Sequence, residues 1–146
     1  NLPANLAKAV EKFAPGWKIK DCGSEMDPGL RAEWAGRKNV LATHPLDRQT
    51  GCVLSRTADI PVGKKTALHV VVGHDPQGNF DLIVRADGRQ LLRKPVSAQT
   101  ATDHWLTADI DLSSFAGKSV TLELVNQPSD WSNEAAYWAE IAVRSE

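Results

Sequence analysis

The chain has 146 residues, of which 42% are hydrophobic and 24% charged, and 17 Lys and Arg against 18 Asp and Glu leave a formal net charge of -1. This length fits one domain with a sizeable core. The charge balance offers no basic excess for nucleic acid or an anionic membrane, and no apolar run reaches the ~20 residues of a membrane span. Only the aromatic residues are unusual, since 5 Trp accompany 3 Phe and 1 Tyr.

The first segment predicts a short amphipathic helix. Apolar residues recur at helical spacing from Leu2 to Phe13 with charged residues between them, and Pro15-Gly16 ends the pattern. Because the chain begins with Asn rather than Met, we expect a processed chain or a segment of a longer one. Residues 1–16 are therefore predicted to be an N-terminal helix or linker, followed by a single β-sandwich domain at 17–146.

The rest of the chain predicts short strands divided by turn residues, with a loop-rich stretch at 23–51 that contains a short apolar run. Strands at this spacing without helical segments between them indicate an all-β fold, an antiparallel β-sandwich of jelly-roll type. The expected strands are Trp17–Cys22, Val53–Ile60, Thr66–Val72, Phe80–Ala86, Gln90–Lys94, His104–Leu112, Ser119–Asn126 and Ala135–Arg144.

One pattern occurs twice. Thr57–Pro61 and Thr107–Asp111 are similar in sequence, and each leads through a Gly-Lys turn into an alternating strand. Two such units are too few for a solenoid. They predict two hairpins of one sandwich.

The stretch Trp105–Leu124 resembles a pattern of galactose-binding-like jelly rolls. It has a Trp-led strand that reaches Asp-Leu-Ser, then an aromatic-Ala-Gly-Lys turn and an alternating strand, and a terminal strand like Ala136–Val143 recurs in the same superfamily. The resemblance covers about residues 52–146. It implies a carbohydrate-binding-module-like accessory β-sandwich of a bacterial secreted protein.

The same resemblance implies a structural calcium ion held by loop carboxylates and carbonyls. Asp75, Asn79, Asp81 and Asp103 supply hard oxygens that suit calcium. No EF-hand spacing accompanies them, and no other cofactor is expected.

Cys22 and Cys52 are too few for a zinc framework, and neither belongs to a CxxC pair. One interpretation is a disulfide across a loop of about 30 residues, which the chain-entropy model credits with roughly 3–4 kcal/mol. A secreted or periplasmic location follows from it. The alternative is two buried free thiols in a cytosolic protein.

No motif predicts catalysis. The four His residues show no metal-binding spacing, no serine lies in a nucleophile elbow, and no pair of carboxylates is aligned for sugar cleavage. We therefore expect no enzyme activity from this chain on its own, although it would fit as part of a larger secreted enzyme.

The five tryptophans separate by their positions in the predicted strands. Trp17 shares the parity of an apolar strand residue and is expected in the core. Trp105 and Trp138 have the parity opposite to their apolar neighbours and are expected on outer faces or at strand ends. Trp34 and Trp131 lie in polar loops.

A loop tryptophan flanked by polar residues suits a sugar, because the ring packs on the C–H face of a pyranose while its neighbours bind the hydroxyls. The alternative is that such a ring caps the open end of the sandwich. The candidate carbohydrate-binding residues are Trp131, Trp34, Asp130, Asn133, Glu134 and Arg37.

Three functions remain open at this point. The first is a non-catalytic accessory module that binds a polysaccharide or glycan and is joined to other domains of a larger chain. The second is a structural or protein-interaction sandwich that packs against a neighbouring domain and binds no sugar. The third is a small lectin-like hydrolase.

Overall fold

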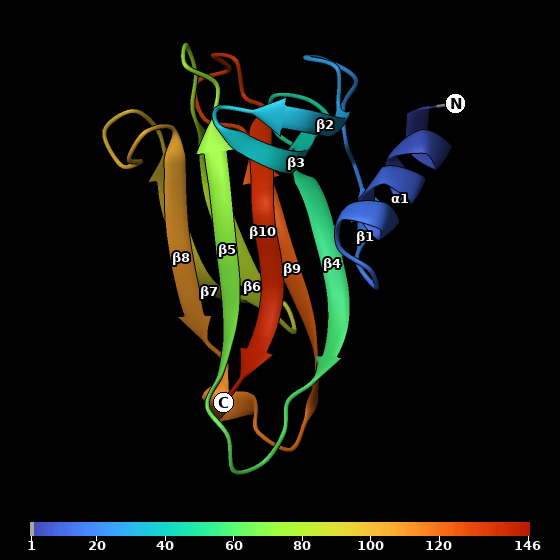
Figure 1. Ribbon diagram of the computed structural model, residues 1–146, viewed down its shortest axis with the longest axis vertical. Coiled ribbons are helices and arrows are strands. Elements are labelled where there is room, and N and C mark those ends of the chain that lie inside the picture. Colours follow the sequence, from blue (N-terminus) through green and yellow to red (C-terminus); the bar gives the residue numbers. More distant parts are fainter. Residues whose placement is uncertain (1) are drawn as a thin grey trace.

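The computed structural model describes residues 2–146 as two antiparallel five-stranded sheets packed face to face, with one N-terminal helix (Figure 1). The predicted jelly-roll class is confirmed. No helix in this described part is long and apolar enough to cross a membrane. The first sheet contains β1 (Lys18–Lys20), β4 (Cys52–Asp59), β9 (Ser119–Gln127), β6 (Phe80–Ala86) and β7 (Arg89–Val96) in that order. The second sheet contains β2 (Gly29–Trp34), β3 (Arg37–Thr43), β10 (Ala136–Ser145), β5 (Thr66–His74) and β8 (Trp105–Asp111) in that order, and a 3-10 turn, η1 (Ser113–Phe115), follows β8.

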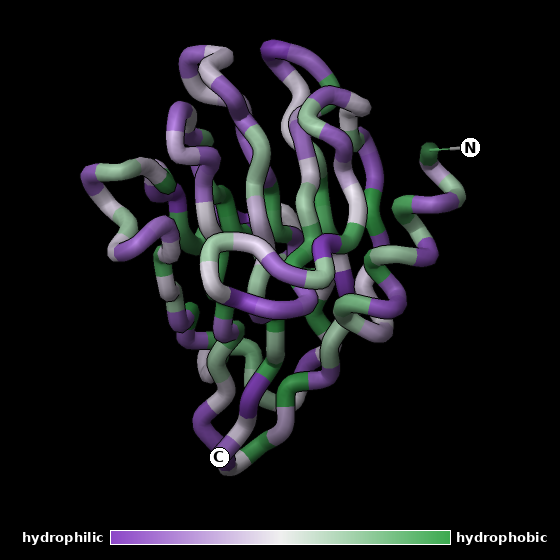
Figure 2. Tube along the Cα trace, turned by 45° about the horizontal axis from the view of Figure 1, so that its top comes forward, coloured by the Kyte–Doolittle hydropathy of each residue, from purple (hydrophilic) through white to green (hydrophobic). Residues whose placement is uncertain are grey.

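The core lies between the two sheets. Hydrophobic and hydrophilic positions alternate along the strands (Figure 2), so each sheet turns one apolar face inward. In β5, for example, Leu68, Val70 and Val72 are fully buried and belong to the main core cluster. Because hydrophobic side chains recur at every second residue, each sheet has one apolar face, and the two apolar faces pack together as a sandwich.

Helix α1 (Leu2–Phe13) lies beside β1 at one edge of the sandwich (Figure 1). Its buried residues are Leu6 and Val10, and Val10 belongs to the same core cluster as the inner faces of the sheets. Trp17, which follows the helix, is 3% exposed and joins that cluster as predicted. The helix and the sandwich thus share one hydrophobic core.

The stretch expected as a loop, 23–51, contains the hairpin β2–β3 instead. Ala35 and Gly36 have φ values of 46° and 82°, the left-handed pair that a tight hairpin turn requires. β3 pairs with the first residues of β10, and from there the hairpin folds over the outer face of the second sheet, at the end opposite the C-terminus (Figure 1). Trp34 is therefore a strand residue, and its prediction as a loop residue was wrong.

The two repeated units are not hairpins. β4 and β9 belong to the first sheet while β5 and β8 belong to the second, so each unit crosses from one sheet to the other. Their turns contact each other: Ile60 N donates to Lys118 O at 2.9 Å, and Gly117 N donates to Ile60 O at 2.8 Å. The repetition therefore reflects two equivalent crossings at one end of the sandwich.

Trp138 faces the core, contrary to the parity prediction. The pairing of β10 with β5 shifts register between Trp138 and Glu140, so a β-bulge reverses the alternation at this point. Trp138 is 0% exposed and its Nε1–H donates to the Thr43 hydroxyl at 3.0 Å. Tyr137 turns to the outer face of the sheet as a result.

Candidate functional site

Loop 128–134, which joins β9 to β10, is organised by one buried carboxylate. Glu134 is 1% exposed, yet Oε1 accepts from Ser129 N at 2.6 Å and Oε2 accepts from Ser132 N at 2.7 Å. The Ser129 hydroxyl adds a third donor at 2.9 Å. Burial raises the pKa of the Glu134 carboxyl, and the hydrogen bonds from Ser129 and Ser132 lower it in part. Trp131, between the two serines, is therefore presented from a fixed loop.

A second loop, 75–79, locks this one in place. Asn79 N donates to Ser132 O at 3.3 Å, and Asn133 Nδ2 donates to Gln77 O at 3.3 Å. A Cβ atom at Gly78 would lie 2.1 Å from Asn133 O, so the two loops approach as closely as glycine permits. The pair forms one rigid rim at the open end of the sandwich.

Trp131 lines a pocket of about 330 Å³, which we call the loop pocket. Its volume lies at the lower end of the range of roughly 300–1,000 Å³ usual for small-ligand sites. The lining residues come from three segments, before β2, after β3 and between β9 and β10. They are Glu25, Met26, His44, Trp131, Asn133 and Glu134.

The Trp131 ring is half-buried and meets two side chains. The His44 ring packs edge-on against it, with centroids 5.3 Å apart. The guanidinium of Arg48, an exposed side chain, lies over the indole 5.5 Å from the centroid. An exposed cation on an aromatic face contributes only about 0.5–1 kcal/mol, so a ligand can displace Arg48 at small cost.

The polar groups of the loop pocket offer both acceptors and donors. His44 is 3% exposed, and its Nδ1 donates to Pro45 O at 2.9 Å because a carbonyl can only accept. Nε2 is therefore the nitrogen that faces the pocket, 3.7 Å from the Glu25 carboxylate. Glu25 is 64% exposed and remains accessible to a hydroxyl group.

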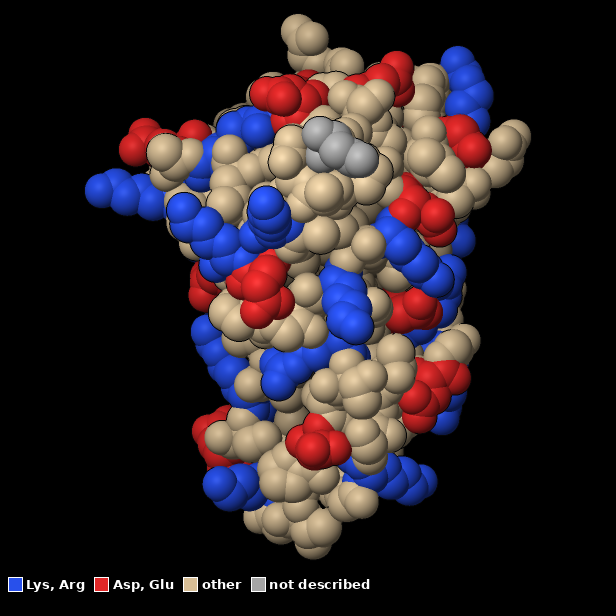
Figure 3. Space-filling model, turned by 90° about the vertical axis from the view of Figure 1, so that its right-hand side faces the viewer, with Lys and Arg blue, Asp and Glu red and all other residues tan. Residues whose placement is uncertain are grey.

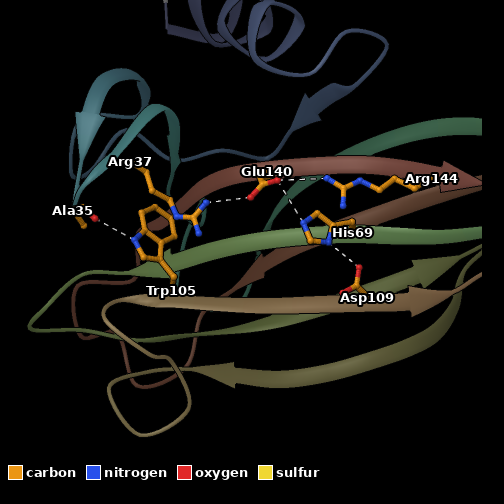
Figure 4. A network of polar contacts seen from close by, with 7 residues as sticks. All are labelled: Ala35, Arg37, His69, Trp105, Asp109, Glu140 and Arg144. Atoms are coloured by element: carbon orange, nitrogen blue, oxygen red, sulfur yellow. Dashed lines mark hydrogen bonds and ion pairs between the residues drawn. The ribbon is translucent and has the colours of Figure 1, made fainter.

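The outer face of the second sheet, which we call the sheet face, carries a network of paired charges (Figure 4). Arg37 Nη1 donates to Glu140 Oε2 at 3.1 Å, and Arg144 Nη2 reaches Glu140 Oε1 at 3.5 Å. His69 lies between two carboxylates, with Nε2 3.5 Å from Glu140 and Nδ1 2.7 Å from Asp109. The polar groups of this face mostly contact one another.

The aromatic residues of the sheet face are also paired. Trp34 stacks on Tyr137 with centroids 3.8 Å apart and meets Trp105 edge-on at 5.5 Å. Trp105 lies on the outer face as predicted, where Arg37 covers its ring at 5.1 Å and its Nε1–H donates to Ala35 O at 3.2 Å. These contacts hold the β2–β3 hairpin down on the sheet.

The structure thus divides the predicted carbohydrate-binding residues between two surfaces. Trp131, Asn133 and Glu134 line the loop pocket, and Asp130, next to them, accepts from Ser132 N at 3.1 Å. Trp34 and Arg37 belong to the sheet face. Sequence reasoning missed Glu25, Met26 and His44, which join the pocket only through the fold and carry no local motif.

Three of the four residues proposed for calcium have other polar partners. Asp81 pairs with Arg93 at 3.0 Å, Asp75 accepts from Gln77 N at 2.9 Å, and the side-chain oxygen of Asn79 contacts the Ser129 hydroxyl. Within residues 2–146, no group of three or more His, Cys, Asp or Glu is arranged to hold a metal ion.

Cys22 and Cys52 are free thiols, so the structure lacks the expected disulfide. The two side chains are nevertheless neighbours. A hydrogen bond from Cys52 lowers the pKa of Cys22, whereas the same contact together with burial raises the pKa of Cys52 well above its usual value. Of the two thiols, Cys22 therefore loses its proton more readily.

A larger, shallow hollow of about 1000 Å³ lies at the opposite end of the second sheet. It contains no aromatic ring on which a sugar could stack, and for this reason the loop pocket is the better candidate. Its lining residues are Lys65, Thr66, Ala67, Asp109, Asp111, Val143, Arg144, Ser145 and Glu146.

Comparison with solved structures defines the class of fold. The CBM22-1 xylan-binding domain of Xyn10C from Paenibacillus barcinonensis is 18% identical, with a TM-score of 0.60 over 90% of this chain and 86% of that one. An adhesin domain of Lys-gingipain from Porphyromonas gingivalis is 15% identical, with a TM-score of 0.61 over 90% and 91%. TmCBM61 in complex with β-1,4-galactotriose is 14% identical, with a TM-score of 0.54 over 94% of both chains.

The chain therefore has the jelly-roll fold of carbohydrate-binding modules and adhesin domains, as the sequence resemblance implied. No protein-family model and no curated protein sequence matches it.

Proposed function

We propose that this protein is a non-catalytic carbohydrate-binding module of a secreted protein and that it binds a glycan in the loop pocket. The observation that carries the proposal is the Trp131 ring, which a rigid loop holds at a pocket with polar side chains around it. A pyranose would place its C–H face on the indole after Arg48 moves aside. Glu25 would accept from sugar hydroxyls, and Asn133 and His44 would complete the polar contacts.

The fold of the structural relatives supports this proposal. Two of them are described as a xylan-binding domain and as a complex with β-1,4-galactotriose. Their low identity to this chain means that the ligand itself has to be found by experiment.

A non-catalytic role fits the contacts of the carboxylates. Glu25 and Glu134 line the same pocket, but both oxygens of Glu134 already accept from Ser129 and Ser132. A general acid must instead direct its proton toward the substrate. We therefore expect binding without release of reducing sugar.

The alternative, a sandwich that docks on another domain, has less support. Among residues 2–146, the exposed large hydrophobic side chains are Leu46 at 49% and Val62 at 77%. Val62 lies before the first residue of β5, whereas Leu46 follows β3, whose end is level with the last residue of β5. The two side chains therefore form no common patch.

Secretion is the remaining part of the proposal. In an oxidising compartment the adjacent Cys22 and Cys52 thiols would be expected to form a disulfide. Titration of free thiols in protein recovered from its native source tests this: no reactive thiol after denaturation supports secretion, and two reactive thiols contradict it.

The decisive experiment is retention on affinity gels that contain plant, algal and bacterial polysaccharides. Trp131→Ala should weaken binding of the retained glycan at least tenfold, or about 1.4 kcal/mol, while Trp131→Phe should keep part of it. Trp105→Ala, on the sheet face, is the matched control and should bind as the unaltered protein does. Binding that is lost in Trp105→Ala but kept in Trp131→Ala would contradict the proposed location, and no retention on any gel would contradict the function.

A further inference from the structure

A hollow of about 260 Å³ lies on the side of the molecule that carries β1 and the end of α1. It is remote from the loop pocket and shares no lining residue with it. Its lining consists of Gly16, Lys18, Ser55, Arg56, Thr57 and Thr121. Two cations and three hydroxyl groups thus converge without a carboxylate among them.

The cations of this hollow are not neutralised within the described part of the chain. Among the described residues, five other Arg side chains form ion pairs with carboxylates, whereas Lys18 and Arg56 form none. Figure 3 shows Lys and Arg side chains gathered over the middle of this side, with fewer Asp and Glu between them. This local excess is notable because the whole chain has a net charge of -1.

The backbone fixes the arrangement of these groups. Lys18 pairs with Ser55 across the β1–β4 ladder, and Thr57 pairs with Thr121 across the β4–β9 ladder. The two threonine hydroxyls are 3.3 Å apart. The hydroxyl donors and Lys18 therefore lie on adjacent strands of one sheet, whose positions are set before any ligand arrives.

Arg56 approaches from the edge beside the helix. Its Nε would lie 3.9 Å from a Cβ atom at Gly16, whose φ of 89° is in the left-handed region. Acidic residues also lie beside this hollow: Glu11 accepts from Gly16 N at 3.1 Å, and Glu123, the partner of Ser55 across the β4–β9 ladder, pairs with Arg85 at 3.5 Å. A guanidinium next to an ammonium and three hydroxyls is the donor set that recognises an oxyanion.

We propose that this hollow binds the oxyanion group of an acidic sugar, either a carboxylate or a sulfate ester. The proposal rests on the proposed glycan-binding function for its ligand class, but it concerns a second site on a different face. Arg56 and Lys18 provide the charge, and the hydroxyls of Ser55, Thr57 and Thr121 complete the coordination of the anion. An acidic polysaccharide would then contact the protein at two separate places.

The test is a nuclear magnetic resonance titration of the whole chain with glucuronate, glucose 6-sulfate, neutral glucose and inorganic sulfate at constant ionic strength. One or both charged sugars should shift the backbone signals of Gly16, Lys18 and Arg56, and glucose should not. The charged sugar that binds more tightly identifies the oxyanion. A charged sugar that binds no better than glucose, or no better than inorganic sulfate, overturns the proposal.

Substitutions test whether Arg56 and Lys18 bind the charged sugar. Arg56→Gln should weaken binding of the charged sugar at least tenfold, and Lys18→Gln about threefold. Arg93→Gln is the matched control because Arg93 is paired with Asp81 on another strand pair, and it should change nothing. Equal binding by Arg56→Gln and the unaltered protein would overturn the proposal.

Failure here is separable from failure of the proposed function. Trp131→Ala should leave the shifts of Gly16 and Lys18 intact, whereas Arg56→Gln should leave retention of a neutral glycan intact. Loss of both kinds of binding in Trp131→Ala would place the charged sugar in the loop pocket and overturn the second site.

Discussion

Replacement of Glu134 by Ala should destabilise the protein although the residue lies in a loop. The change removes the acceptors of two backbone N–H groups, those of Ser129 at 2.6 Å and Ser132 at 2.7 Å. Hydrogen bonds to a charged group contribute about 1.5–3 kcal/mol each. Removal of a buried charge offsets part of this loss, so we expect a net destabilisation of about 2–4 kcal/mol.

Urea unfolding followed by tryptophan fluorescence measures this effect. Glu134→Gln should lie between Glu134→Ala and the unaltered protein, because its amide keeps one acceptor oxygen. Glu140→Ala is the control, since that carboxylate is 40% exposed and surface ion pairs contribute about 0–1 kcal/mol. If Glu134→Ala destabilises the protein no more than Glu140→Ala does, the carboxylate does not organise the loop.

The pH dependence of the same comparison has a definite sign. Burial raises the pKa of Glu134 in the folded state, so the folded protein retains this proton at a pH where the unfolded chain releases it. The stability of the unaltered protein relative to Glu134→Gln should therefore be highest below the ordinary carboxyl pKa and should decline as pH rises through the raised value. A difference that grows with pH would contradict this interpretation.

Three further predictions concern the loops, the core and the thiols. Gly78→Ala should separate the two interlocked loops and weaken glycan retention, because its Cβ would lie 2.1 Å from a carbonyl oxygen of the facing loop. Unchanged retention would contradict the rigid rim. Trp138→Phe should lower the free energy of unfolding by about 1–3 kcal/mol, since it leaves the buried Thr43 hydroxyl without its indole donor. A urea midpoint equal to that of the unaltered protein would argue against the core position of Trp138. Iodoacetamide should modify Cys22 before Cys52 in the reduced protein, because the pKa of Cys22 is lowered and that of Cys52 is raised; peptide mass spectrometry that finds the reverse order would contradict the direction of these shifts.

Much of the fold follows from the sequence because strand alternation and turn residues are local signals. The strand at Phe80–Ala86 begins and ends where the pattern predicted, and helix α1 occupies the predicted apolar repeat. The β2–β3 hairpin was missed because its turn is formed by Ala35 and Gly36 rather than by a typical Asn-Gly or Asp-Gly pair. Leu30, Ala32 and Trp34 do alternate with charged residues, but without a typical turn pair the stretch was interpreted as a loop.

The site was harder to predict because it depends on register and on distant segments. A single bulge between Trp138 and Glu140 reverses which aromatic residue of β10 faces the core, and nothing in the sequence marks a bulge. The polar loop around Trp131 was recognisable from its composition. His44 and Glu25 were not, because only the packing of three separate segments brings them to that ring.

The most direct test of the central claim is a titration of the protein with a soluble oligosaccharide of the retained glycan, monitored by the indole N–H signals of its 5 tryptophans. The Trp131 signal should shift with the ligand, while those of the buried Trp17 and Trp138 should stay in place. A shift confined to Trp34 and Trp105, with Trp131 unmoved, would contradict the account and move the binding site to the sheet face.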